Sequence, residues 1–102
     1  MKLCYLSGPM RGKPDLNREQ FNKAAEKLRQ DGWEVFNPAA ANLEGWPIER
    51  IFSYELTFIC EQADAIAMLP GWSMSDGANA EYWAAKATGK KKIIYLTEAD
   101  LA

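Results

Sequence analysis

The sequence contains no histidine, and this absence excludes several classes of enzyme. Without histidine, neither a Ser-His-Asp nor a Cys-His catalytic unit can form, and no metal site can use imidazole ligands. Any proton transfer or nucleophilic attack must therefore depend on carboxylates, lysine, tyrosine, serine or cysteine.

Cysteines are few, and long apolar runs are absent. The two cysteines, Cys4 and Cys60, lie far apart and form no CxxC motif. Each has apolar neighbours, so we expect two buried, reduced thiols and a cytoplasmic location. No apolar run is long enough for a membrane span or a signal segment, so we expect neither.

The sequence also has no excess of positive charge. The chain has 12 Lys+Arg against 14 Asp+Glu, a formal net charge of −2. A protein that binds nucleic-acid polymers needs a basic surface to displace counterions, so we exclude that class while allowing a local site for one small phosphate. The 102 residues, 48% of them hydrophobic, fit one globular domain over residues 1–102.

The sequence does contain a regular alternation of strand and helix patterns. Apolar stretches predict strands over Lys2–Ser7, Trp33–Phe36, Asp64–Leu69 and Ile93–Leu96. Helical patterns run over Asp15–Asp31, from Pro47 to about residues 60–63, and over Asn79–Thr88. This order predicts an α/β domain of the three-layer Rossmann or flavodoxin-like type, with a mostly parallel sheet of four to five strands. Right-handed crossovers place the strand-to-helix loops at one edge, where such folds bind ligands.

The first of these loops is Ser7-Gly8-Pro9-Met10-Arg11-Gly12. Its two glycines allow the backbone to approach a ligand closely, and Arg11 carries donors that match phosphate or carboxylate oxygens. The loop matches neither a P-loop nor a GxGxxG fingerprint. A tight turn with an exposed arginine is the alternative interpretation. Tyr5, in the preceding strand, either points its hydroxyl into the cleft or faces the other side of the sheet.

A second loop, residues 70–80, leads to Glu81. Ser73 and Ser75 lie where a helix begins, a position that favours anions, although Ser75 or Asp76 can instead cap that helix. Glu81 shares its helix face with small residues, so its carboxylate can come close to a ligand or to the sheet. The alternative is a solvated glutamate in the first turn. The small residues on that face are Gly77, Ala78, Ala84, Ala85 and Thr88.

Two further carboxylates lie in apolar surroundings. Glu55 shares a helical stripe with apolar residues, and Asp64 opens the third strand. Glu55 can pair with Arg50 or Arg11, or the two acids can divide acid, base and nucleophile roles at one ligand.

The four tryptophans of the sequence fall into two groups. We expect Trp33 and Trp83 in the core, and Trp46 and Trp72 in the ligand-edge loops, where they can stack on a planar base.

The order of these motifs resembles that of a known enzyme superfamily. The relevant stretches are Tyr5-Leu6-Ser7-Gly8-Pro9-Met10-Arg11-Gly12, the strand opened by Asp64, and Ser73-x-Ser75-x-Gly77-x-x-x-Glu81. Together they resemble the nucleoside 2-deoxyribosyltransferase superfamily, which includes deoxynucleoside 5′-monophosphate N-glycosidases. The resemblance extends to Leu96. The Leu-Pro-Gly-Trp-Ser stretch is similar to a small branch, common in phage and bacterial genomes, of unknown function.

The resemblance implies cleavage or exchange of the N-glycosidic bond of a nucleoside or nucleotide. A glutamate in the position of Glu81 attacks the anomeric carbon and forms a covalent glycosyl-enzyme, while an aspartate matching Asp64 assists. The serines match those that bind a 5′-phosphate. This chemistry needs carboxylates and no histidine. The resemblance also implies a homo-oligomer, and neither a metal nor an organic cofactor. Where family members often carry Arg-Asp, this chain has Tyr54-Glu55.

We therefore predict Glu81, Asp64 and Glu55 as catalytic residues of a site for a small nucleoside or nucleotide. The predicted substrate-binding residues are Tyr5, Ser7, Gly8, Pro9, Met10, Arg11, Gly12, Trp72, Ser73, Ser75 and Gly77. Two alternatives stay open. One is a non-catalytic nucleotide-binding or sensor module on the same scaffold, suggested by the Glu55 departure and the small size. The other is an interaction protein without a ligand.

Overall fold

The predicted α/β architecture is confirmed by a computed structural model, which describes residues 2–89 and 92–102. Four parallel strands form one sheet in the order β2-β1-β3-β4. The strands are β1 (Leu3–Ser7), β2 (Glu34–Phe36), β3 (Ala65–Met68) and β4 (Lys92–Tyr95). The helices are α1 (Arg18–Gln30), α2 (Ile48–Glu61) and α3 (Asp76–Ala87). Short 3-10 turns cover Pro14–Asn17, Trp72–Met74 and Glu98–Leu101.

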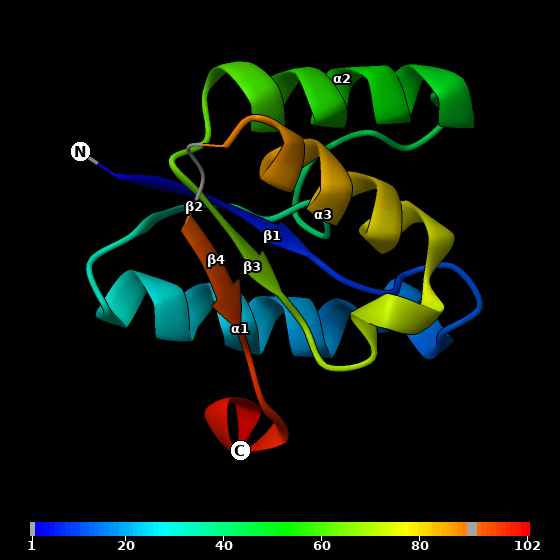
Figure 1. Ribbon diagram of the computed structural model, residues 1–102. Coiled ribbons are helices and arrows are strands. Elements are labelled where there is room, and N and C mark those ends of the chain that lie inside the picture. The colour runs from blue at the N-terminus through cyan, green and yellow to red at the C-terminus, as the bar shows by residue number, and fades with distance from the viewer. Residues whose placement is uncertain (1, 90–91) are drawn as a thin grey trace.

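The sheet separates two apolar layers, because successive strand residues point to opposite faces. Figure 1 shows α1 on one face of the sheet and α2 and α3 on the other. Cys4 and Leu6 of β1 pack with α1, whereas Tyr5 packs with α2 and α3. The two central strands are buried on both faces, which explains their continuous apolar sequences.

The boundaries of two helices differ from the predicted ones. Asp15, Leu16 and Asn17 have left-handed φ angles of 50°, 54° and 61°, so α1 begins at Arg18 rather than at Asp15. The Asn17 amide ties this segment to the Pro9 carbonyl at 2.9 Å. Helix α3 begins three residues earlier than predicted, because the Ser75 hydroxyl accepts a hydrogen bond from the Ala78 amide at 3.2 Å and caps the helix.

Two predictions of burial were wrong. Cys4 is a buried free thiol as expected, but the free thiol of Cys60 is exposed. Trp83 is 59% exposed rather than part of the core, and Trp33 is only partly buried. Both errors have the same cause. Neighbouring residues of a helix point about 100° apart, so Cys60 turns away from the buried Ile59.

In the described part of the chain, no helix combines the length and the apolar character needed to cross a membrane.

Gly8 marks the tightest approach between the first loop and β3. A Cβ atom at this position would lie 2.7 Å from Cβ and 2.8 Å from Cδ1 of Leu69. Only a residue without a side chain fits there, since Leu69 is itself 1% exposed and has no room to move. The glycine therefore lets the first loop pass directly over the carboxyl end of β3.

We expect Gly8→Ala to destabilise the fold by about 1–3 kcal/mol through overpacking against Leu69. Gly77→Ala is the matched control, because the nearest contact of its Cβ would be an ordinary 3.6 Å to Phe52. This control lies inside α3 and should be neutral or stabilising by up to about 1 kcal/mol. Urea denaturation of both variants measures the difference, and equal stabilities would contradict this account of Gly8.

Candidate active site

A cavity of about 970 Å³ opens at the carboxyl edge of the sheet. Its walls come from the loops that follow β1, β2 and β3, together with α2 and α3. This is the edge at which the predicted strand-to-helix loops were expected to meet, and they do meet there. The volume lies within the range of pockets that hold small organic ligands.

Glu81 is the central acid of this cavity and is held by two hydroxyl groups. Tyr5 Oη donates a hydrogen bond to Glu81 Oε2 at 2.8 Å, and Ser7 Oγ donates one to Oε1 at 2.6 Å. Tyr5 and Ser7 are two residues apart on β1, so both side chains face α3. Glu81 is 7% exposed and lines the cavity. Both oxygens of Glu81 are therefore held by residues of β1, while its carboxylate group borders the cavity.

Small residues allow α3 to bring Glu81 this close to β1. Ala78 and Ala85 lie one turn before and one turn after Glu81, and both are almost fully buried. Gly77 borders the cavity and leaves room beside Phe52. The small-residue face recognised in the sequence thus packs toward the sheet, and Glu81 is a buried acid rather than a solvated one.

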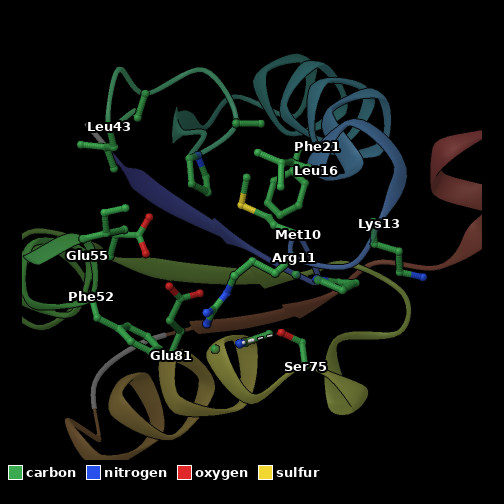
Figure 2. A pocket seen from close by; sticks show the side chains of 18 of the residues that line it. Met10, Arg11, Lys13, Leu16, Phe21, Leu43, Phe52, Glu55, Ser75 and Glu81 are labelled. Carbon is green, nitrogen blue, oxygen red and sulfur yellow. Dashed lines mark hydrogen bonds between the residues drawn. The ribbon is translucent and has the colours of Figure 1, made fainter. Parts of the chain in front are cut away.

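Glu55 supplies a second buried carboxylate from α2. It is 8% exposed, lines the cavity, and lies near enough to Glu81 and Tyr5 for its charge to raise the pKa of both. The ion pair with Arg50 or Arg11, which was one of the two interpretations, does not form among the described residues. The Arg50 guanidinium instead lies 4.1 Å from the Trp46 ring centroid. Figure 2 shows the two carboxylates on neighbouring walls of the pocket.

Burial and the nearby Glu55 raise the proton affinity of Glu81. Burial, followed by the charge of Glu55, raises the pKa of Glu81 to about 8 from an ordinary value of 4.5, although the hydrogen bonds from Ser7 and Tyr5 partly oppose this. Burial is also the main cause of the raised pKa of Glu55. Two adjacent buried carboxyl groups cannot both ionise cheaply, so the pair retains one proton near neutral pH. It therefore combines one carboxylate with one carboxylic acid.

The mouth of the cavity carries groups suited to an anion. Figure 2 shows Arg11 reaching into the pocket from the first loop, and Ser75 at the start of α3 lies close by. Lys13 and Arg18 add positive charge to the lining. Arg18 already donates to the Ala39 carbonyl at 2.9 Å and pairs with Asp15 and Glu44. Arg11 is exposed, with its guanidinium available to a ligand.

Much of the remaining lining of the cavity is apolar. It includes one aromatic loop residue, Trp46, as expected from the sequence. Trp72 was expected beside it, but it stacks on Tyr82 with ring centroids 4.4 Å apart and does not line the cavity. The apolar side chains of the lining are those of Met10, Leu16, Phe21, Leu43, Trp46, Ile48, Ile51 and Phe52.

Most of the predicted site residues are brought together. Those that line the cavity are Tyr5, Gly8, Pro9, Met10, Arg11, Glu55, Ser75, Gly77 and Glu81. Ser7 lies fully buried behind Glu81 and acts on its carboxylate. Gly12, Trp72 and Ser73 do not line it. Gly12 is exposed beyond the turn at Arg11, and Ser73 is exposed in the 3-10 turn, where its carbonyl accepts a hydrogen bond from Asn79.

Asp64 was predicted as a catalytic residue, and the structure places it elsewhere. It immediately precedes β3, and its side chain accepts a hydrogen bond from the Leu3 amide at 2.9 Å. Four strand residues, spanning roughly 13 Å, separate it from the edge that carries the cavity. Asp64 therefore joins the beginnings of β1 and β3, and it is not part of the site around Glu81.

The β2–α2 loop was expected at the ligand edge, but apart from Trp46 none of its residues was predicted to form the site. Residues 38–46 of this loop line the cavity, together with Arg18 from α1. The available signal was the position of the loop, because it follows a strand at the ligand edge. Its residues, such as Ala40 and Ala41, carry no obvious chemistry, and this is why they attracted no functional prediction.

Comparison with protein families then assigns the chain. A family model described as "Domain of unknown function (DUF4406)" matches residues 1–95, from before β1 to the end of β4. The chain belongs to the DUF4406 family. A search of curated proteins finds no match. The chemistry of this DUF4406 domain therefore has to be argued from the cavity and its carboxylates.

Burial of Glu81 makes stability fall as the pH rises. Between pH 4.5 and about 8 the unfolded chain has released a proton that the folded chain retains. The free energy of unfolding therefore decreases with rising pH, by at most about 1.4 kcal/mol per unit for one group. We expect Glu81→Gln, which cannot ionise, to flatten this slope in urea titrations. Glu61→Gln, which changes an exposed glutamate on α2, should keep the wild-type slope. Identical slopes for all three proteins would refute the assignment.

Proposed function

We propose that the protein cleaves or exchanges the N-glycosidic bond of a nucleoside or nucleoside 5′-monophosphate, with Glu81 as the nucleophile. One observation carries the proposal. The Glu81 carboxylate faces a ligand-sized cavity, has both oxygens fixed by Tyr5 and Ser7, and lies near a second buried carboxyl group of the same lining, that of Glu55. Paired carboxylates of this kind support glycosyl transfer with retention of configuration.

In the first step, a Glu81 oxygen attacks C1′ of the sugar and forms a C1′–O bond. The C1′–N bond breaks, and its electron pair leaves with the base. The proton that rests on Glu81 in the empty site moves to Glu55 in the reactive form, so Glu81 attacks as the anion and Glu55 supplies the proton that the departing base needs. Nucleophile and acid thus come from one buried pair, because its single retained proton leaves one carboxyl group ionised and the other neutral.

In the second step, water attacks C1′ and the bond to Glu81 breaks. Glu55, now ionised, accepts the proton from this water, so the pair returns to its starting state. The products are the free base and the free sugar or sugar phosphate. A second base that enters in place of water gives base exchange by the same sequence of bonds.

Tyr5 and Ser7 position the nucleophile. Each donates to one oxygen of Glu81, so the carboxylate cannot rotate away from the cavity. These hydrogen bonds also favour the ionised form of Glu81, since they oppose the effect of burial on its pKa. An aligned anion in a water-poor site is a better nucleophile than a mobile one.

The rest of the cavity offers places for the two ends of a nucleotide. The apolar part of the lining with Trp46 suits a planar base, whereas Arg11, Ser75 and the start of α3 suit a 5′-phosphate. Glu81 lies between them on the lining, where the sugar would be. The two free cysteines fit the reducing cytoplasm, in which free nucleotides occur.

The first test is base release. Wild-type protein is incubated with a panel of nucleosides and nucleoside 5′-monophosphates, and free bases are measured by mass spectrometry. We expect release by the wild type and a loss on the order of a thousandfold or more in Glu81→Gln. Glu61→Gln is the matched control and should retain full activity. A wild-type protein that binds nucleotides without releasing base would instead support the alternative of a non-catalytic nucleotide-binding module.

The second test concerns the phosphate. We expect Arg11→Ala to raise KM for the nucleoside monophosphate roughly tenfold or more, because one charge-assisted contact is lost, while KM for the matching nucleoside stays unchanged. Arg29→Ala, which removes an exposed arginine of α1 outside the cavity, is the control. Equal effects of Arg11→Ala on both substrates would show that Arg11 does not bind the phosphate.

A further inference from the structure

Strand β4 forms one end of the sheet, and its outer edge is open among the described residues. Lys92 donates its amide to the Asp64 carbonyl at 3.2 Å, and Leu96 donates its amide to the Met68 carbonyl at 3.0 Å. Successive residues of a strand turn their backbone groups to opposite sides. The backbone N–H and C=O groups of Ile93 and Tyr95 therefore face away from β3. Figure 1 shows β4 at this end of the sheet, below α3.

The side chains around this edge are unusually apolar for a free surface. Tyr95 is 55% exposed and Trp83 of α3 is 59% exposed. Both contact the buried Tyr82, whose ring centroid lies 6.3 Å from that of Tyr95 and 5.3 Å from that of Trp83. The Tyr82 and Tyr95 hydroxyls are also hydrogen-bonded at 2.8 Å. The exposed rings are thus held in place by the core rather than free to move.

Strand β2, at the opposite end of the sheet, has three residues and is followed by Asn37 and Pro38. A short length and a nearby proline are features that protect an edge strand from pairing with another chain. Both edge strands begin with an exposed charged residue, Glu34 in β2 and Lys92 in β4. Strand β4 continues with Ile93, Ile94 and Tyr95, which favour pairing.

The geometry of β4 is compatible with pairing to a second copy of itself. In an antiparallel pair centred on Ile94, Ile93 of one copy lies opposite Tyr95 of the other, and both residues present their free backbone groups. Each such pair exchanges two hydrogen bonds, and residues directly opposite each other share one face of the sheet. An aromatic ring beside a β-branched side chain is a favourable cross-strand pair.

We propose that two copies of this chain associate through β4, antiparallel about a two-fold axis, and form one continuous sheet. Such an interface is self-complementary, as a closed dimer requires, and it consumes the open edge of both copies. Trp83 and Tyr95 then flank the shared strands on the α3 side. The proposal depends on β4 and its surroundings and is independent of the chemistry at Glu81.

Sedimentation velocity over a range of concentrations tests the association, with Tyr95→Lys as the variant. We expect a wild-type dimer and a dissociation constant raised about tenfold or more in the variant, since a lysine replaces the ring in both cross-strand pairs. Tyr54→Lys is the matched control. It changes a tyrosine of similar exposure (43%) on α2 and should leave the dimer intact. A wild-type protein that stays monomeric at all concentrations overturns the proposal.

Hydrogen exchange of the wild-type amides provides a second readout that does not depend on a variant that folds. Pairing through β4 predicts slow exchange of the Ile93 and Tyr95 amides at high protein concentration and faster exchange on dilution. The Ile94 amide faces β3 and should be slow at both concentrations. A dimer in which Ile93 and Tyr95 exchange rapidly would use another face, and that result would also overturn the proposal.

Discussion

The site depends on a buried carboxylate that receives two hydroxyl hydrogen bonds from a single strand. A carboxylate with 7% exposure is costly unless its oxygens are satisfied, and Tyr5 and Ser7 supply that satisfaction to Glu81. Tyr5 and Ser7 are two residues apart, and alternate residues of a strand point to the same face, so β1 alone places both donors. The small residues of α3 then allow the acid to reach them. Helix α3 can therefore approach β1 closely because Ala78 and Ala85, one turn to either side of Glu81, are small.

Glu55 adds a second carboxyl group to this arrangement. A single buried acid with two donors can simply be ionised, whereas a second acid nearby competes for the same proton. Helix α2 brings the Glu55 carboxyl group close enough to Glu81 and Tyr5 to raise the pKa of both. The two acids therefore come from two helices, α2 and α3, while the hydroxyl groups that hold Glu81 come from β1.

The sequence predicted the fold well because the fold depends on local patterns. Buried parallel strands are apolar throughout, and α1 shows its apolar face in Phe21, Ala24, Ala25 and Leu28. The partners of Glu81 were harder to predict, since Tyr5 lies 76 residues away and either face of a strand was open to it. For Glu55 the sequence left an ion pair with an arginine and a catalytic role both open, because the proximity of two acids from different helices leaves no trace in the sequence. Asp64 was an avoidable error. A residue that opens a parallel strand lies at the edge opposite the ligand loops.

Helix α3 presents Glu81 and Tyr82 as consecutive residues on different sides. The first faces the cavity, and the second supports the rings beside β4. Glu81 and Tyr82 therefore keep a fixed spacing along one helix. A substitution that shifts α3 at the cavity also shifts the support of the exposed rings beside β4, so a variant made at one of these surfaces has to be checked at the other.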